Sequence, residues 1–111
     1  RLGVSDAIHI FQGNIDDTYP PANSLIDKID FAYVDANHKF TPTLKYFSWI
    51  LEKSHPETII VLDDIHWSQD MEKAWKEIQK FPEVTLSIDL YRFGLVFLRK
   101  GQAKEHFRLW I

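Results

Sequence analysis

Three aspartates and two histidines follow two short apolar segments of the chain at matching distances. They are Asp35 and His38, after residues 29–34, and Asp63, Asp64 and His66, after residues 58–62. In both segments a histidine stands three positions after the first aspartate. Carboxylate oxygens are the ligands that Mg²⁺, Ca²⁺ and Mn²⁺ prefer, and an imidazole titrates near neutral pH and can serve as a general base. These residue types therefore predict a divalent-cation site, an acid–base site, or both.

The two apolar segments that precede these residues have the composition of buried strands. Residues 29–34 read Ile-Asp-Phe-Ala-Tyr-Val, and residues 58–62 read Thr-Ile-Ile-Val-Leu. Continuous runs of this kind are typical of a parallel α/β sheet that is covered on both faces. Ligands bind such sheets outside the carboxyl ends of the strands, so we expect the carboxylates and imidazoles to gather on one rim.

Structural roles compete with the functional ones at each of these positions. An aspartate directly after a strand is commonly a turn former or a cap, and this role is favoured for Asp64 taken alone. A loop histidine commonly holds a local hydrogen bond, which is the competing interpretation of His38 and His66. The equivalent placement of the two histidines favours function, and Trp67 is placed to wall a substrate pocket.

The composition limits the class of protein. A length of 111 residues suits one domain with a modest core, and a formal net charge of -3 gives no indication of nucleic-acid binding. The absence of cysteine excludes disulfides, thiolate catalysis and cysteine-ligated zinc, and it is compatible with a cytoplasmic location. No apolar stretch approaches the ~20 residues of a membrane span, so no membrane contact is predicted.

The remaining strand patterns lie near the two ends of the chain. Residues 7–13 predict a short strand that ends at a Gly13-Asn14 turn. Residues 84–90 alternate apolar and mostly polar side chains, and residues 94–98 are nearly all apolar. We interpret this pair as an antiparallel hairpin, which gives an α/β fold with an antiparallel edge.

Two helices are predicted between the strands. Thr41-Pro42 has the features of a helix start, with threonine as N-cap and proline in the first turn. Ser68 is a second N-cap candidate, and the helix after it has an apolar face formed by Met71, Ala74, Trp75 and Ile78.

The combination of these segments resembles the C-terminal half of class I S-adenosylmethionine-dependent methyltransferases. The resemblance rests on Asp-Phe-Ala-Tyr-Val-Asp-Ala-Asn-His at residues 30–38, on Ile-Ile-Val-Leu-Asp-Asp at residues 59–64, on the helix after each, and on the terminal hairpin. It covers about residues 7–99 and is greatest for O-methyltransferase-like members that act on small molecules. It implies a partial Rossmann-like methyltransferase sheet of parallel strands with helices, ending in an antiparallel C-terminal hairpin.

The resemblance also implies roles for individual residues. Gly13 and Asn14 match the turn near the adenine of S-adenosylmethionine, with asparagine in place of the usual aspartate. Asp35 matches an acidic residue near the sulfonium and the substrate. In metal-dependent members such a residue binds a divalent ion, for example Mg²⁺, together with a pair that Asp63 and Asp64 match. The implied reaction is methyl transfer to an oxygen nucleophile of a small molecule, with His38 or His66 as the proton acceptor.

One departure from the family is large. Its glycine-rich cofactor loop and acidic ribose-binding residue should precede residue 7, and no Gly-x-Gly pattern occurs in the chain. We therefore expect residues 1–111 to be the C-terminal part of a larger methyltransferase domain and to be inactive alone. The family places two further strands between the strands that residues 7–13 and 29–34 match. Their loss would leave the second of these as an open edge, which predicts a homodimer through that edge or an altered placement of residues 1–28.

Three other functions remain open at this point. A phosphoacceptor receiver domain also has aspartates at strand ends, but here the acidic pair follows the lone aspartate, and no strand-end lysine occurs before Lys100. A metal-dependent hydrolase would use the same carboxylates without S-adenosylmethionine. A non-catalytic half-domain would have an inert rim and would assemble through its exposed sheet edge.

Overall fold

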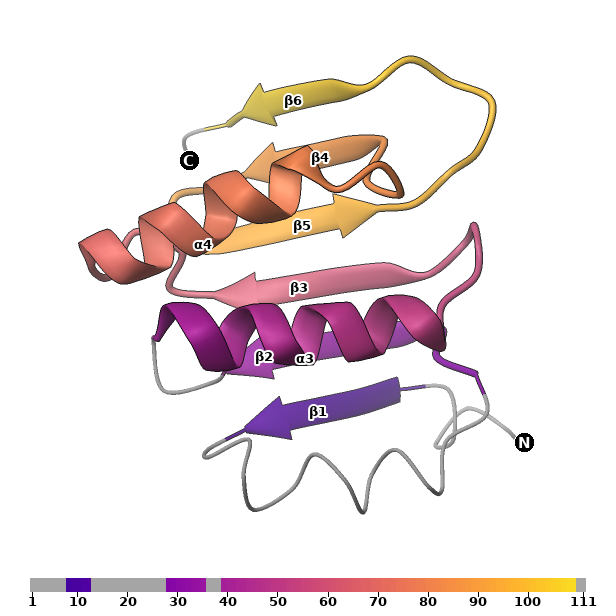
Figure 1. Ribbon diagram of the computed structural model, residues 1–111. Coiled ribbons are helices and arrows are strands. Elements are labelled where there is room, and N and C mark those ends of the chain that lie inside the picture. Colours follow the sequence, from indigo (N-terminus) through magenta and orange to yellow (C-terminus); the bar gives the residue numbers. More distant parts are fainter. Residues whose placement is uncertain (1–7, 13–27, 36–38, 110–111) are drawn as a thin grey trace.

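A computed structural model of the chain describes residues 8–12, 28–35 and 39–109. Within these ranges six strands form one sheet, and two helices pack on it (Figure 1). In chain order the elements are β1 (Ile8–Gln12), β2 (Phe31–Asp35), α3 (Phe40–Glu52), β3 (Ile59–Asp63), α4 (Gln69–Lys80), β4 (Leu86–Asp89), β5 (Phe93–Phe97) and β6 (Glu105–Arg108). The strand order across the sheet is β1-β2-β3-β5-β4-β6.

The strand directions follow from the connections. β1, β2 and β3 run parallel, with α3 as the crossover between β2 and β3. β5 lies antiparallel between β3 and β4, and β6 runs parallel to β4 at the far edge. The predicted α/β class and the C-terminal hairpin are therefore confirmed, and the arrangement is that of a partial Rossmann-like sheet.

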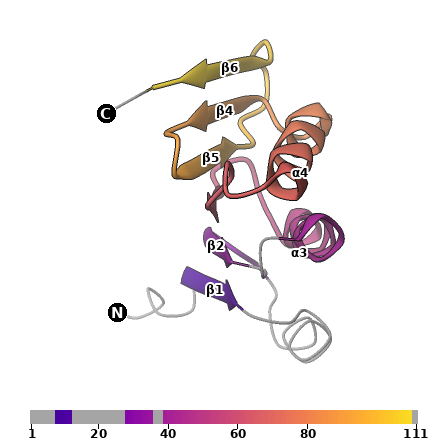
Figure 2. The same ribbon diagram turned by 90° about the vertical axis from the view of Figure 1, so that its left-hand side faces the viewer.

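Both described helices lie on the same face of the sheet (Figure 2). Alternate residues of the strands, such as Ala32, Ile60 and Val96, are completely buried on that face. The helices contribute large buried side chains to the same core, listed here as Tyr46, Phe47, Trp49 and Ile50 from α3 and Ala74, Trp75 and Ile78 from α4. Gly94 lies under Trp75, because a Cβ at residue 94 would be 2.5 Å from Cζ3 of that ring.

The opposite face of the sheet carries a second set of apolar side chains. The strand register aligns them in rows across the sheet, because paired residues of neighbouring strands share a face. They are Phe31, Tyr33, Ile59, Val61, Leu86, Ile88, Phe93, Leu95, Phe97 and Phe107. No helix of the described ranges covers this face, and its side chains are half-buried, or exposed in the case of Phe107. We call it the uncovered face. Among the described residues, the expectation of a sheet covered on both sides is thus met on one side.

The family strand order predicted that β2 would have an open edge, but β1 occupies that edge. β1 pairs with β2 in parallel along its whole length, from Ile8 opposite Phe31 to Gln12 opposite Asp35. Of the two predicted alternatives, the altered placement of residues 1–28 is therefore the one that is observed, and it is observed for residues 8–12. Its physical reason is that the backbone amides and carbonyls on the free side of β2 gain hydrogen-bond partners.

Of the two predicted N-caps, Ser68 is confirmed and Thr41 is wrong. Ser68 caps α4, since its hydroxyl accepts a hydrogen bond of 3.2 Å from the Met71 amide. The N-cap of α3 is Lys39, without a side-chain hydrogen bond, so Thr41 and Pro42 lie inside the first turn rather than at the cap. Neither helix of the described ranges has the length and apolar character needed to span a membrane.

Candidate functional site

The first feature of the candidate site is the edge where the parallel strands end, which we call the carboxyl rim. Asp35 is the last residue of β2 and Asp63 is the last residue of β3. These strands are parallel neighbours, and their register places Val34 opposite Leu62, one residue before the two aspartates. Neighbouring strands lie ~4.8 Å apart, so Asp35 and Asp63 emerge side by side as the sequence predicted.

Asp63 is the buried carboxylate of this rim. The residue is 8% exposed, and it lies opposite Phe93 on the uncovered face. The hydroxyl group of Tyr33 donates a hydrogen bond to it. Burial and then this hydrogen bond raise the pKa of Tyr33 to about 12, with the charges of Asp63, Asp35 and Asp64 adding to the shift. Tyr33 is therefore a neutral donor at physiological pH.

One oxygen atom of Asp63 is left without a hydrogen bond. Oδ1 is buried and has no hydrogen-bond donor within the described residues. Nε of Arg92 lies 3.9 Å away, which is ion-pair distance but too long for a hydrogen bond. A buried acceptor in this condition costs about 1–3 kcal/mol, so a donor that a ligand brings to Oδ1 would be stabilised there.

Asp64 has the geometry of a turn residue. Its φ is 54°, in the left-handed region that aspartate tolerates better than most residues. Its amide donates a hydrogen bond of 2.7 Å to the Arg92 carbonyl, and its carbonyl accepts one of 3.0 Å from the Trp67 amide. Oδ1 of Asp64 also lies 3.8 Å from Nε of Arg92. The structural role favoured for Asp64 from the sequence is thus the one that its backbone performs.

The predicted metal ligands do not form a ligand set. Among the described residues, which include Asp35, Asp63 and Asp64, no three acidic or histidine side chains lie close enough together to hold a metal ion. The guanidinium of Arg92 lies against both Asp63 and Asp64 and supplies the positive charge there. These residues therefore do not fit a resident divalent ion in the present arrangement, and metal assistance stays a prediction.

His66 lies on the helix side of the sheet, between two carboxylates. Its Nε2 is 2.7 Å from Oδ2 of Asp89, and its Nδ1 is 3.0 Å from Oε2 of Glu72. The ring also stacks on Tyr91, with centroids 5.6 Å apart. Burial lowers the pKa of His66, but hydrogen bonds to Glu72 and Asp89 outweigh it, and the pKa is raised from its ordinary value of 6.5.

These contacts separate His66 from the other candidate residues. Asp89, its buried partner, lies on the helix side together with Ser87, whereas Tyr33 and Asp63 belong to the uncovered face. Because a carboxylate contacts each ring nitrogen, the geometry favours a role in holding α4 against β4. Its predicted role as a general base is not tested. Gly13, Asn14 and His38 lie outside the described residues.

Three residues at the rim were not singled out from the sequence. Tyr33 is concealed within an apolar run, and its position next to Asp63 depends on strand register. Arg92 stands in the hairpin turn and reaches the two aspartates because β5 pairs with β3. Asp89 ends a strand as Asp35 and Asp63 do, and that repeated pattern was a signal that could have identified it.

Comparison with known proteins identifies the family of the chain. A family model described as a methyltransferase domain matches residues 1–65, which is more than half of the chain. No curated protein matches the sequence. The matched part contains β1, β2, α3 and β3 with Asp35 and Asp63 at their ends. The chain belongs to this methyltransferase domain family, of the class I S-adenosylmethionine-dependent kind.

Proposed function

We propose that this domain transfers the methyl group of S-adenosylmethionine to an oxygen nucleophile of a small molecule. The observation that carries the proposal is the shared rim, where Asp35 and Asp63 end two parallel strands of a methyltransferase-family chain. Carboxylates at this place suit a cofactor that carries a positive sulfonium and an acceptor that carries a hydroxyl group.

The residues present fit only part of the cofactor. The acidic rim suits the sulfonium end, and Gly13 with Asn14 is proposed to contact the adenine. The chain contains no Gly-x-Gly segment that could approach the methionine and ribose portions with its backbone. We therefore propose that residues 1–111 form the C-terminal part of a methyltransferase domain and that a glycine-rich segment completes the cofactor site.

The roles of the chain's own residues follow from their contacts. Bound S-adenosylmethionine would supply the electrophilic methyl group. Asp63 would accept a hydrogen bond from the acceptor hydroxyl at Oδ1, while Tyr33 fixes the orientation of its carboxylate. Holding the hydroxyl in line with the methyl group would supply much of the rate. The proton would go to His38, since both ring nitrogens of His66 contact carboxylates.

The proposal is tested with the natural full-length protein and S-adenosylmethionine, which carries the sulfonium charge, in a calorimetric titration without a methyl acceptor. Asp35→Asn should weaken binding about tenfold or more, equivalent to about 1.4 kcal/mol. Glu57→Gln is the matched control, because Glu57 is an exposed acid in the turn before β3, at the other end of that strand. Equal binding by the Asp35→Asn variant, or no binding by the full-length protein, would refute the proposal.

A non-catalytic half-domain that assembles with another chain is the second candidate function. Two observations favour it, namely the missing glycine-rich segment and the uncovered face. Binding of S-adenosylhomocysteine by the 111-residue chain would contradict the inert half-domain. Turnover of simple phosphoesters without S-adenosylmethionine would instead indicate the metal-dependent hydrolase.

A further inference from the structure

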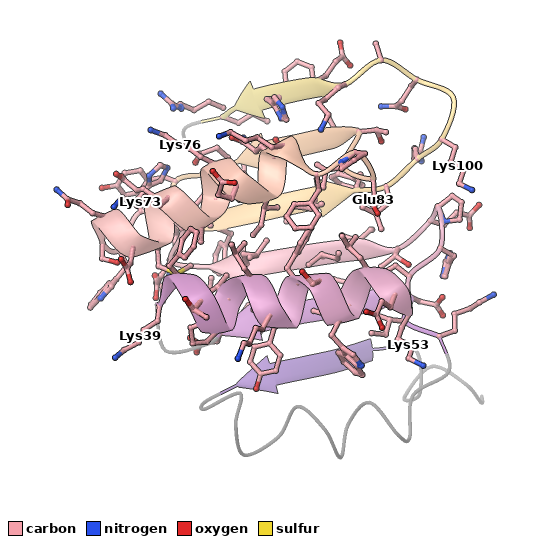
Figure 3. The ribbon with its side chains drawn as sticks, in the orientation of Figure 1. Lys39, Lys53, Lys73, Lys76, Glu83 and Lys100 are labelled. Atoms are coloured by element: carbon pink, nitrogen blue, oxygen red, sulfur yellow. The ribbon has the colours of Figure 1, made fainter. Side chains whose placement is uncertain are left out.

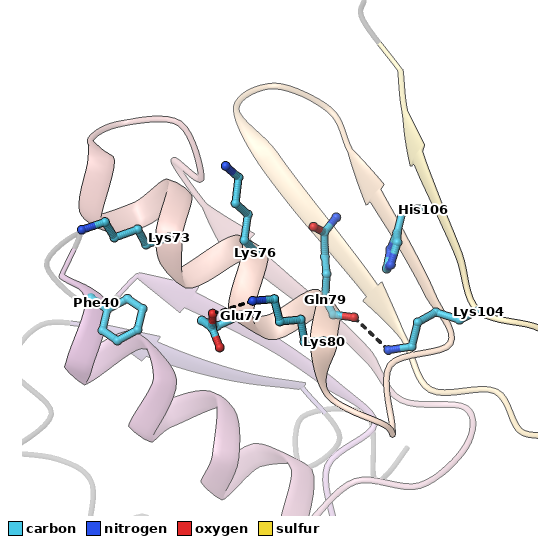
Figure 4. A pocket seen from close by; sticks show the side chains of 8 residues that line it. All are labelled: Phe40, Lys73, Lys76, Glu77, Gln79, Lys80, Lys104 and His106. Carbon is cyan, nitrogen blue, oxygen red and sulfur yellow. Dashed lines mark hydrogen bonds and ion pairs between the residues drawn. The ribbon is translucent and has the colours of Figure 1, made fainter.

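A lysine-lined groove runs along the exposed side of α4 (Figure 4). It has a volume of about 620 Å³, which is within the range of small-molecule sites. Its lining extends from the start of α3 to the beginning of β6, and the residues are Phe40, Lys73, Lys76, Glu77, Gln79, Lys80, Lys104 and His106. We call it the lysine groove, and it is separate from the carboxyl rim.

The charge of this groove is opposite to that of the whole chain. Four lysines and one glutamate line it, although the chain has a formal net charge of -3. Oε2 of Glu77 is 3.1 Å from Nζ of Lys80. The charge of Glu77 is therefore paired with Lys80 and not with the other lysines of the groove. In the described part of the chain no carboxylate lies within ion-pair distance of Lys73 or Lys76. The groove therefore attracts anions.

Lys104 is fixed in position at one end of the groove. Its ammonium donates hydrogen bonds of 2.8 Å to the Gln79 carbonyl and 2.7 Å to the Phe81 carbonyl, at the C-terminus of α4. An ammonium has three donors, so one remains for a ligand. Partial desolvation of this exposed residue and then the charge of Lys104 lower the pKa of the neighbouring His106, which makes that imidazole responsive to an added negative charge.

The arrangement of the lysines indicates the ligand. Lys73, Lys76 and Lys80 follow one another along the helix, and seven helical residues span roughly 10 Å. One phosphate cannot contact lysines over this distance, whereas a short chain of phosphates can. Lysine ammoniums are compact point charges that suit phosphate oxygens, and the cationic side chains that line the groove are lysines.

We propose that the lysine groove binds a short polyphosphate chain, either free or as part of a nucleoside polyphosphate. The phosphate oxygens would contact Lys73 and Lys76 from α4 and the remaining N–H of Lys104. Phe40 closes the groove at its other end, where a nucleobase would meet its ring. The proposal does not depend on the methyltransferase reaction, because none of these residues belongs to the carboxyl rim.

The test is calorimetric titration of the 111-residue chain with inorganic tripolyphosphate. The double variant Lys73→Glu with Lys76→Glu should bind at least about tenfold more weakly, because two ammoniums are replaced by two carboxylates. The matched control is Lys53→Glu with Lys100→Glu, which makes the same charge change at the other end of the molecule (Figure 3). The control should stay within about twofold of the unchanged chain. Thermal unfolding of each variant verifies that it is folded.

Further titrations distinguish a free phosphate chain from a nucleotide and define the results that would contradict the proposal. Equal binding of tripolyphosphate and a nucleoside triphosphate supports a site for the chain alone, and tighter binding of the nucleotide supports the nucleotide. In either case the NMR titration of His106 should shift to higher pH when the ligand is bound. Absence of binding, equal binding of orthophosphate, equal loss in the control variant, or binding of oligonucleotides alone would overturn the proposal.

Discussion

At the scale of single residues, His66 connects a helix to a strand through two carboxylates. It joins Glu72 in the first turn of α4 to the buried Asp89 at the end of β4. A protonated imidazole donates to both carboxylates, whereas a neutral ring has only one N–H and must leave one of them without a donor. The state of this ring therefore controls how firmly the start of α4 is held on the sheet.

This arrangement predicts a pH dependence of stability. The pKa of His66 is raised on folding, so its contribution is complete below pH 6.5 and is lost as the pH rises through the folded-state pKa. Urea unfolding between pH 5.5 and 8.5, about the range in which histidine titrates, should show the unchanged chain losing its advantage over His66→Gln. The advantage at the acid end should be of order 1 kcal/mol. A difference that does not change with pH would contradict this account.

The sequence anticipated part of the residue-level site and missed the rest for an identifiable reason. Asp35 and Asp63 could be placed together because apolar runs locate strand ends, and parallel strands share a rim. The partners of His66 could not be placed, because Glu72 and Asp89 come from two other elements. The same applies to Arg92, whose contact with Asp63 depends on β5 inserting next to β3.

At the scale of elements, the two helices differ in how they begin. The hydroxyl group of Ser68 accepts a hydrogen bond from the Met71 amide, whereas α3 begins after Lys39 without a side-chain bond. Ser68→Ala should therefore cost about 1 kcal/mol of unfolding free energy. Thr41→Ala, the matched change in the first turn of α3, should cost much less. Denaturant unfolding of both variants makes the comparison, and a larger loss for Thr41→Ala would show that threonine is the effective cap.

The packing of α4 on β5 gives a second prediction at this scale. A methyl group at Gly94 would overlap the six-membered ring of Trp75, with the closest approach at 2.5 Å. Gly94→Ala should destabilise the chain by about 1–3 kcal/mol through overpacking. In a Trp75→Leu background the same change should cost clearly less, because the overlapping ring is absent. A double-mutant cycle measures this coupling, and additive effects would contradict the proposed contact.

Most elements could be read from the sequence, and the exceptions share a cause. Runs such as Ile59–Asp63 and the periodic face of α4 identify themselves by hydrophobic pattern. β6 has the sequence Glu-His-Phe-Arg, with all four residues exposed, so no pattern marked it as a strand. It exists through backbone pairing with β4, and it contains His106 of the lysine groove. The sequence predicted β1 as a strand, but it did not predict that β1 pairs with β2.

At the scale of the whole molecule, the sheet is covered unevenly. The two described helices pack on one side, and ten apolar side chains are aligned on the uncovered face. Within the residues described, the outer sides of β1 and β6 are also unpaired in the sheet order. Apolar surface and free strand edges both favour association with another chain.

The edge of residues 29–34, through which the sequence predicted a homodimer, is occupied by β1. We therefore expect the chain to self-associate through the outer side of β1 or β6 instead. Sedimentation over a wide range of protein concentration should show a rising mass. Phe107 is 47% exposed on the uncovered face at the edge strand, so Phe107→Lys should weaken association if the two surfaces act together. Trp67→Lys is the control, because Trp67 is 67% exposed but lies in the loop between β3 and α4, outside any strand. A mass that stays that of one chain at every concentration would contradict the expectation.

The insertion of β5 between β3 and β4 has a consequence for synthesis on the ribosome. β1, β2 and β3 can pair as soon as each emerges, because they follow one another in the chain and in the sheet. The free side of β3 is closed only by β5, whose last residue is Phe97, and β4 has no neighbour before that point. The nascent polypeptide therefore carries an apolar strand with an open side until β5 has emerged from the ribosome, and chaperone binding protects it most during this interval.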